Sequence, residues 1–158
     1  MREYYKIVSY CPSRAKEIAE LFYQAVHSID PNIYSVSQQC AWAPSPINYQ
    51  KWGKRLANKK PFLLLINDKV VGFMELEKDG HIDCAYVHPN YQQQGVATYL
   101  LSHLIKRAKH SHISTLHVEV SIVAKPLFEK FDFKAIKSQT VIRNNVPLMQ
   151  YLMQKRLV

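Results

Sequence analysis

Long apolar runs are missing from this sequence. The longest, Phe62 to Ile66, is far too short to span a bilayer, and the first ten residues lack the apolar core of a signal peptide. We therefore predict a cytoplasmic protein that has no membrane among its partners.

Cysteine is also scarce. The three cysteines, Cys11, Cys40 and Cys84, are an odd number and form no C-x-x-C pair, which argues against a disulfide framework and against a zinc site. No H-E-x-x-H spacing occurs either, so we predict no metal. Cys84 lies in an apolar run, where a small buried residue is expected rather than a nucleophile.

Glycine-rich phosphate loops are absent. The chain has four glycines and contains neither a Walker loop nor the three-glycine dinucleotide fingerprint, which excludes the usual nucleoside triphosphate and dinucleotide sites. Acidic residues are a minority, 12 against 21 basic ones, and the net charge of +9 favours polyanionic partners. Because the basic residues are dispersed in short groups, nucleic acid is not expected among them.

The length and the apolar content, 158 residues and 47% hydrophobic, are sufficient for a single domain with its own core, residues 1–158. Helical spacing predicts a helix after Pro12, a short one after Pro46, one after Gly95, and one that Pro126 delays or kinks near its start. The segment 32–46 has no clear period and is expected to be a long ordered loop. Strands are predicted at 4–10, 62–66, 70–76, 82–87, 116–120, 133–142 and 146–153.

The segment 81–109 is the most informative. A predicted strand is followed by a turn at residues 88–90 and then by apolar residues at helical spacing. Gly95 falls in the first turn of this predicted helix, where unpaired N–H groups and the helix dipole bind phosphate. Gly95 and Ala97 are small enough for a bulky anion to approach the main chain. We predict a pyrophosphate site made of Gln92, Gln93, Gln94, Gly95, Val96, Ala97 and Thr98.

The run from Gln92 to Ala97 resembles the acyl-CoA-binding motif Gln/Arg-x-x-Gly-x-Gly/Ala of the GNAT superfamily of N-acetyltransferases. The preceding residues 86–89 match the strand ending of that family. The resemblance implies an α/β fold of order β-α-α-β-β-β-α-β-α-β-β, whose mixed, mostly antiparallel sheet is splayed between strands four and five. It also implies transfer of an acetyl group from acetyl-CoA to a primary amine of a small molecule or peptide, by direct attack in a ternary complex.

A second block resembles the family motif that flanks the pantetheine and the thiol. It stands here as Ser121-x-x-Ala124-x-x-x-Phe128-x-x-x-Asp132-Phe133. With Tyr86 and Val87, the residues Ser121, Ala124 and Phe128 complete the cofactor site that the resemblance implies. Asp132 replaces a glycine and must adopt a turn conformation. Phe128 replaces the tyrosine that acts in the family as general acid, and Ser121 is the first alternative donor because a phenyl ring has no proton to give.

Catalysis needs a donor to the thioester carbonyl and a route for the proton of the amine. The resemblance assigns the first role to the backbone N–H of Val87. The candidate bases are Glu75, His81 and Asp83, although each of these types is also common as a cap or a surface charge.

For the acceptor, His27, Tyr34 and Trp42 are candidates in the region that the family uses, and their rings indicate an acceptor with an apolar part. Short strings such as 42–44, 124–126 and 153–155 are similar to a bacterial subgroup of the superfamily. Two alternatives stay open. The chain is an enzyme, or it is an acyl-CoA-binding or regulatory module. Such a module would be associated with nucleic acid or would be catalytically inert. The resemblance also leaves a homodimer open.

Overall fold

The computed structural model describes residues 4–158 of the predicted 1–158 domain, and residues 1–3 lie outside the described part. One sheet of seven strands has the order β1-β2-β3-β4-β5-β7-β6. The strands are β1 Lys6–Ser9, β2 Phe62–Ile66, β3 Lys69–Leu76, β4 His81–Val87, β5 Thr115–Val120, β6 Lys134–Arg143 and β7 Val146–Arg156. The α-helices are α1 Ala15–His27, α2 Val36–Trp42, α3 Tyr49–Lys59, α4 Val96–His110 and α5 Lys125–Lys130, and short 3-10 turns cover Pro12–Arg14 and Pro89–Tyr91.

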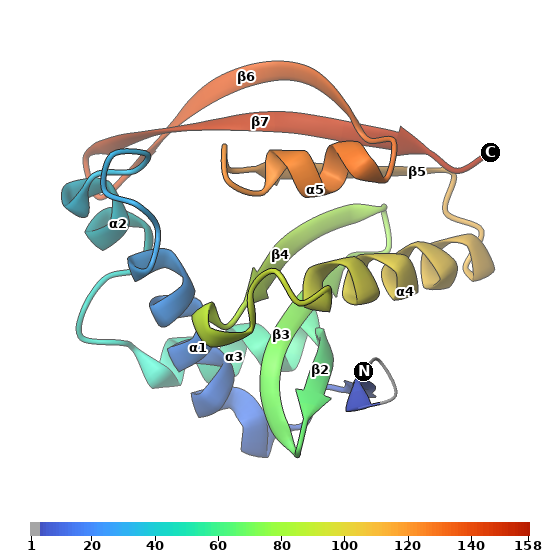
Figure 1. The fold of residues 1–158 in the computed structure, drawn as a ribbon, viewed down its shortest axis with the longest axis horizontal. Helices are drawn as coiled ribbons and strands as arrows, with labels where there is room; N and C mark the ends of the chain where they lie inside the picture. The colour runs from blue at the N-terminus through green and yellow to red at the C-terminus, as the bar shows by residue number, and fades with distance from the viewer. Residues whose placement is uncertain (1–3) are drawn as a thin grey trace.

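The sheet is open in the middle. β4 and β5 form a parallel pair at only two positions, His81 with His117 and Ile82 with Val118. Beyond Ile82 the two strands separate, and Figure 1 shows them close at one end and apart at the other. The other neighbouring strands pair antiparallel. The predicted α/β sheet, mixed and splayed between its fourth and fifth strands, is therefore confirmed.

Helices cover both faces of the sheet. Met74 and Ile82 pack with α4 on one face, while Phe73 and Cys84 pack with α1 and α3 on the other. Phe128 of α5 joins the cluster under α4. The two apolar clusters fix the helices that flank the opening between β4 and β5.

Gly72 sets how closely α4 approaches the sheet. A β-carbon built on Gly72 would lie 2.8 Å from Cγ1 of Val96 and 2.9 Å from Cδ1 of Leu100. Both side chains are fully buried and have little room to move. The absence of a side chain on β3 therefore allows the first turns of α4 to rest directly on the sheet.

The predicted turns are also present. Asn67 and Asp68 have positive φ between β2 and β3, and Asn144 and Asn145 do so between β6 and β7. Asn and Asp tolerate this left-handed region better than most residues, which makes them suited to tight hairpins. Asp132 has φ 67°, the turn conformation that was expected of it.

The predicted loop over 32–46 is wrong, because the segment contains helix α2. Ser35 caps this helix: its hydroxyl accepts from the N–H of Gln38 at 3.1 Å, and the Gln38 side chain accepts from the N–H of Ser35 at 2.9 Å. This reciprocal capping box satisfies two helix-end donors. Gln38 also donates to the carbonyl of Pro147 at 3.0 Å, which ties α2 to β7.

A second correction concerns Gly95, which precedes α4 as its N-cap with φ 82° and is not inside the first turn. This left-handed conformation is one that glycine adopts without steric cost. None of the helices in residues 4–158 is both long and apolar enough to cross a membrane.

Candidate active site

Two hollows meet at the opening of the sheet. The first, which we name the sheet cleft, has a volume of about 140 Å³ and is lined by β4, β5, the start of α5 and the ends of β6 and β7. The second, the helix cleft, has a volume of about 460 Å³ and lies among α1, α3, the 43–48 segment and β4. Four residues line both: Trp42, Asp83, Tyr86 and Arg143.

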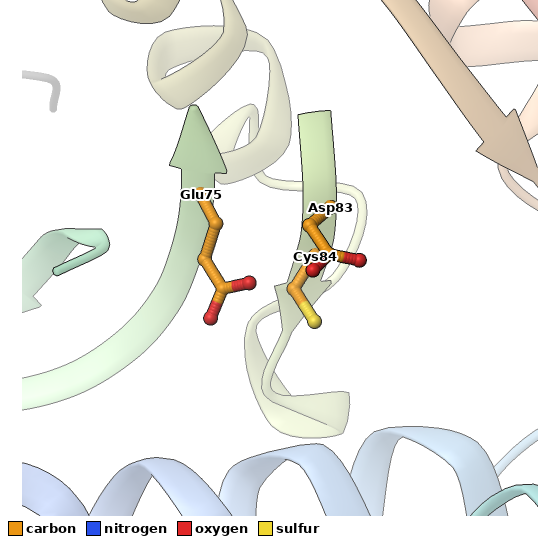
Figure 2. Close-up of side chains that lie close together, drawn as sticks. All are labelled: Glu75, Asp83 and Cys84. Carbon is orange, nitrogen blue, oxygen red and sulfur yellow. The ribbon is translucent and has the colours of Figure 1, made fainter. Parts of the chain in front are cut away.

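A β-bulge shapes β4 at this junction. Met74 pairs with Ala85 and Leu76 pairs with Ile82, so that Asp83 and Cys84 together oppose the single residue Glu75. Consecutive residues of a regular strand point to opposite faces. Here Asp83 and Cys84 turn toward the same side as Glu75, as Figure 2 shows.

Arg55 of α3 binds this group of three. Its Nη2 atom lies 2.5 Å from Oε1 of Glu75, 3.1 Å from Oδ2 of Asp83 and 3.0 Å from Sγ of Cys84. Burial raises the pKa of Glu75, and the positive charge of Arg55 opposes that effect. Glu75 is 0% exposed and lines neither cleft, which separates this candidate base from any acceptor in them.

The same three residues are the kind that bind metals, since their ligand atoms all lie within 4.8 Å of one another. The guanidinium of Arg55 contacts each of them and supplies the positive charge that a cation would bring. A metal ion would have to displace the guanidinium of Arg55. We therefore keep the prediction, made from the sequence, that no metal binds here.

Asp83 differs from Glu75 because it lines both clefts. Burial raises its pKa, but hydrogen bonds and charges from Lys59 and Arg55 outweigh burial and lower the pKa overall. Lys59 Nζ lies 3.0 Å from Oδ2 of Asp83. Asp83 therefore presents an ionised carboxylate at the junction of the two clefts, which suits it to attract an ammonium group.

His81 is held between two carboxylates and lines neither cleft. Its Nδ1 lies 2.6 Å from Oε1 of Glu77, and its Nε2 lies 3.0 Å from Oε1 of Glu119. Burial lowers the pKa of His81, but the hydrogen bonds to these two carboxylates outweigh it and raise the pKa overall. Both ring nitrogens of His81 therefore contact carboxylates and do not face an acceptor. Glu119 lines the sheet cleft and is the nearer group to the opening.

The backbone of β4 directs Val87 into the opening. The N–H of His88 donates to the carbonyl of Val71 at 2.8 Å, and Val87 pairs with Gly72. In an antiparallel ladder this bond makes Val87 and Gly72 a pair without mutual hydrogen bonds. The N–H of Val87 therefore points away from β3, to the side where β4 and β5 have separated.

Tyr86 brings a hydroxyl group to the junction. Its oxygen accepts a hydrogen bond from Nε1 of Trp42 at 3.1 Å, and its own O–H has no acceptor among the described residues. Burial raises the pKa of Tyr86, so the hydroxyl keeps its proton. Burial also raises the pKa of the neighbouring Cys84, which makes its thiol a weak nucleophile, in line with the buried role expected from the sequence.

Ser121 and Ala124, which precede α5, and Phe128 within α5 line the sheet cleft. The Ser121 hydroxyl accepts from the N–H of Ala124 at 3.2 Å. Phe128 is 1% exposed and packs edge-on against Phe133. Tyr34 supports this end: its hydroxyl accepts from the N–H of Ile122 and donates to the carbonyl of Met149, each at 3.0 Å.

The predicted phosphate site lies at the start of α4. Gln93 has φ 60° and Gly95 has φ 82°, so the chain turns sharply into the helix. Tyr5 donates a hydrogen bond to the carbonyl of Gln94, and Gln92 Nε2 donates to that of Val87 at 3.4 Å. Gly95 is the N-cap of this helix and makes no side-chain cap hydrogen bond.

The three acceptor candidates are distributed unevenly. Trp42 lines both clefts, Tyr34 lines only the sheet cleft, and His27 lines neither. His27 instead contacts the carbonyl of Ala43 at 2.8 Å through Nε2 and stacks on Tyr23. Sequence reasoning missed the cations of the helix cleft, Lys51, Arg55 and Arg143, because they are far apart in the chain and share no motif.

Comparisons with known proteins agree with this arrangement. The family model of the acetyltransferase (GNAT) domain matches residues 32–155. The uncharacterized N-acetyltransferase YafP of Escherichia coli (strain K12) is 35% identical over 136 residues, which span 86% of this chain and 85% of YafP. The crystal structure of a GCN5-related N-acetyltransferase from Rhodopseudomonas palustris superposes with a TM-score of 0.91 at 31% identity, over 96% of this chain and 95% of that one.

A more distant structure, yncA of Salmonella typhimurium with its cofactor acetyl-CoA, superposes with a TM-score of 0.75 at 16% identity, over 98% of this chain and 94% of that one. At this identity the likeness concerns the fold alone. The family model and the first two relatives are sufficient for the assignment: the chain belongs to the GNAT acetyltransferase family and is an acyltransferase.

Proposed function

We propose that residues 1–158 act as one N-acetyltransferase domain that transfers the acetyl group of acetyl-CoA directly to a primary amine. The observation that carries this proposal is the meeting of the two clefts at the opening of the sheet. Two substrates that enter from different sides can touch at Tyr86 and Asp83 at the same time. Such an arrangement favours direct attack within a ternary complex.

Acetyl-CoA is the co-substrate, and the described residues fit it. The start of α4 and the left-handed Gly95 suit the pyrophosphate, because main-chain N–H groups and the helix dipole bind anions. The open side of β4, with the N–H of Val87 facing it, suits the pantetheine and the thioester carbonyl. Ser121, Ala124 and Phe128 enclose the thiol end.

The reaction forms one C–N bond and breaks one C–S bond. Val87 polarises the thioester carbonyl through its N–H, which stabilises the negative charge that develops on oxygen. Asp83 attracts the ammonium form of the acceptor, which then loses a proton to water. About one in a thousand alkylamine molecules is neutral at pH 7, since an ordinary ammonium pKa is about 10. Burial of the amine in the cleft disfavours the ammonium form and so raises the reactive fraction, whereas the Asp83 carboxylate serves to bind the ammonium form.

Tyr86 is the donor that we assign to the departing sulfur in place of the tyrosine that Phe128 replaces. Its O–H has no acceptor within the described chain, and its oxygen is fixed by Trp42. Because burial raises its pKa, Tyr86 stabilises the thiolate by a hydrogen bond more than by full proton transfer. Ser121, which lines the sheet cleft, is the alternative donor.

The test measures thiol release from acetyl-CoA and N-acetylated product, side by side, over a panel of primary amines. We expect the two to appear in equal amounts. Release of the thiol without acetylated amine would contradict the transferase. Binding of acetyl-CoA with no thioester cleavage for any amine would indicate a binding or regulatory module, and steep salt dependence of nucleic-acid binding would then favour the latter.

The role of Tyr86 has its own variants. Tyr86→Phe should lower kcat by about 10- to 150-fold, as expected for loss of a hydrogen bond to a charged group, while acetyl-CoA affinity stays near that of the parent. Tyr91→Phe is the matched control, because Tyr91 lines neither cleft. Equal kcat in the two variants would remove Tyr86 from the reaction.

A further inference from the structure

Cations without counter-ions line the helix cleft. Lys51 from α3 and Arg143 from β6 both line it, and neither has an acidic partner among residues 4–158. The third cation, Arg55, is already bound to Glu75 and Asp83. Two positive charges in this cleft are therefore unbalanced.

The acidic side of the same cleft is weak. Asp83 is its one acidic lining residue in the described chain, and Asp83 already contacts both Arg55 and Lys59. A cleft with this balance repels an acceptor of several positive charges and attracts one that brings a negative group. Its volume, about 460 Å³, is in the range of small-molecule sites.

Arg143 lies at the junction of the two clefts, where it could bind an acidic group of the acceptor. It lines both clefts, as do Tyr86 and Asp83, and its charge acts on the Tyr86 hydroxyl. The hairpin turn that follows Arg143 is tied to α2, because Asn144 Nδ2 donates to the carbonyl of Ala41 at 3.0 Å. The planar guanidinium of arginine binds carboxylate or phosphonate oxygens in pairs, which gives direction as well as affinity.

The rest of the lining is aromatic. Phe22 packs on Trp52 with ring centroids 4.9 Å apart and on Tyr86 with centroids 4.8 Å apart. All three rings line the helix cleft. They offer an apolar surface next to the charged residues, which suits an acceptor with an apolar side chain.

We propose that the acceptor is a small amine that also carries an acidic oxyanion group and an apolar side chain, of the kind found in an α-amino acid or an aminophosphonate. Arg143 and Lys51 bind the acidic group, Asp83 faces the ammonium, and the side chain rests on Phe22 and Trp52. This substrate class rests on the transferase proposed above.

The experiment compares amines that differ only in the group next to the amine: phenylalanine, its aminophosphonate analogue, phenylalanine amide and phenethylamine. With saturating acetyl-CoA, the two acidic amines should have higher kcat/KM than the two others. The kcat/KM values of phenylalanine and of its aminophosphonate analogue show which of the two acidic groups the site prefers. Equal or better use of the amide or of phenethylamine would overturn the proposal.

Three variants locate the charge. Arg143→Gln should raise KM for the acidic amines by about 10- to 150-fold and leave that of the amide nearly unchanged, as expected for a lost hydrogen bond to a charged group. Lys51→Gln should act in the same direction. Lys54→Gln is the control, because Lys54 is exposed on the same helix but lines neither cleft. An unchanged preference in both Arg143→Gln and Lys51→Gln would refute the assignment.

A binding measurement separates the failure of this inference from failure of the transferase. Calorimetry with CoA present compares N-acetylphenylalanine with N-acetylphenethylamine. Tighter binding of N-acetylphenylalanine that is lost in Arg143→Gln supports the inference, even if no amine is acetylated. Missing acetylation would count only against the transferase. Equal binding of the two ligands overturns the inference whatever the turnover.

Discussion

Replacing Gly72 with alanine should destabilise the protein and weaken acetyl-CoA binding together. The new methyl group would lie 2.8 Å from Cγ1 of Val96 and 2.9 Å from Cδ1 of Leu100, closer than carbon atoms approach without a shift. Val96 is β-branched and 1% exposed, and Leu100 is 0% exposed, so neither moves without repacking. Overpacking of a buried site costs about 1 to 3 kcal/mol. Displacement of α4 would also move the N–H groups that we propose for the pyrophosphate.

The matched control is Gly53→Ala. The same methyl group at Gly53, in α3, meets no atom within 4 Å in the described structure. Alanine in a helix interior is favoured over glycine by about 0.5 to 1 kcal/mol, so this variant should be slightly more stable than the parent. Urea unfolding gives both free energies, and calorimetric titration gives acetyl-CoA affinity. Equal unfolding free energies for Gly72→Ala and Gly53→Ala would refute the packing argument.

Three further predictions concern the site. Gly95→Asp should abolish acetyl-CoA binding, because its carboxylate would repel the pyrophosphate. Asn is similar to Asp in size and in its tolerance of positive φ, so Gly95→Asn should bind acetyl-CoA more tightly than Gly95→Asp. Equal affinities of the two variants in a titration would contradict this electrostatic explanation. Burial lowers the pKa of His81, but Glu77 and Glu119 outweigh it and raise the pKa overall, so His81 should stabilise the fold fully below its unfolded pKa of about 6.5 and lose this contribution as pH rises through the folded pKa. The difference in unfolding free energy between the parent and His81→Asn should therefore shrink in alkaline buffer. A difference independent of pH would contradict this prediction. Cys84→Ala should keep its turnover, since no activator lowers the pKa of this buried thiol, and inactivity of a folded Cys84→Ala protein would count against direct transfer.

Features with local causes could be predicted from the sequence. The left-handed turns at Asn144 and Asp132 follow from residue type, and the helix after Gly95 follows from its apolar spacing. The phosphate site stays a prediction, and it rests on small residues that are contiguous in the chain at a strand-to-helix turn. Helix α2 was missed although Ser35 and Gln38 form a capping box, since a helix of seven residues is too short to establish a period.

Other features depend on contacts between distant segments. The bulge at Asp83 arises from the register of β3 against β4, which no local pattern encodes. The binding of Arg55 to Glu75 and the convergence of Lys51 with Arg143 require α3, β3 and β6 to be placed in space first. For the same reason His81 was a reasonable candidate base from its type alone, and its two carboxylate partners became visible only in the fold.

Initial-velocity kinetics test the central claim, direct transfer in a ternary complex, most directly. Acetyl-CoA and the best amine of the panel are each varied at several fixed concentrations of the other, and the rate of thiol release is measured. Direct attack at the junction of the two clefts predicts double-reciprocal lines that intersect. Parallel lines, together with an acetyl group trapped on the enzyme, would contradict it.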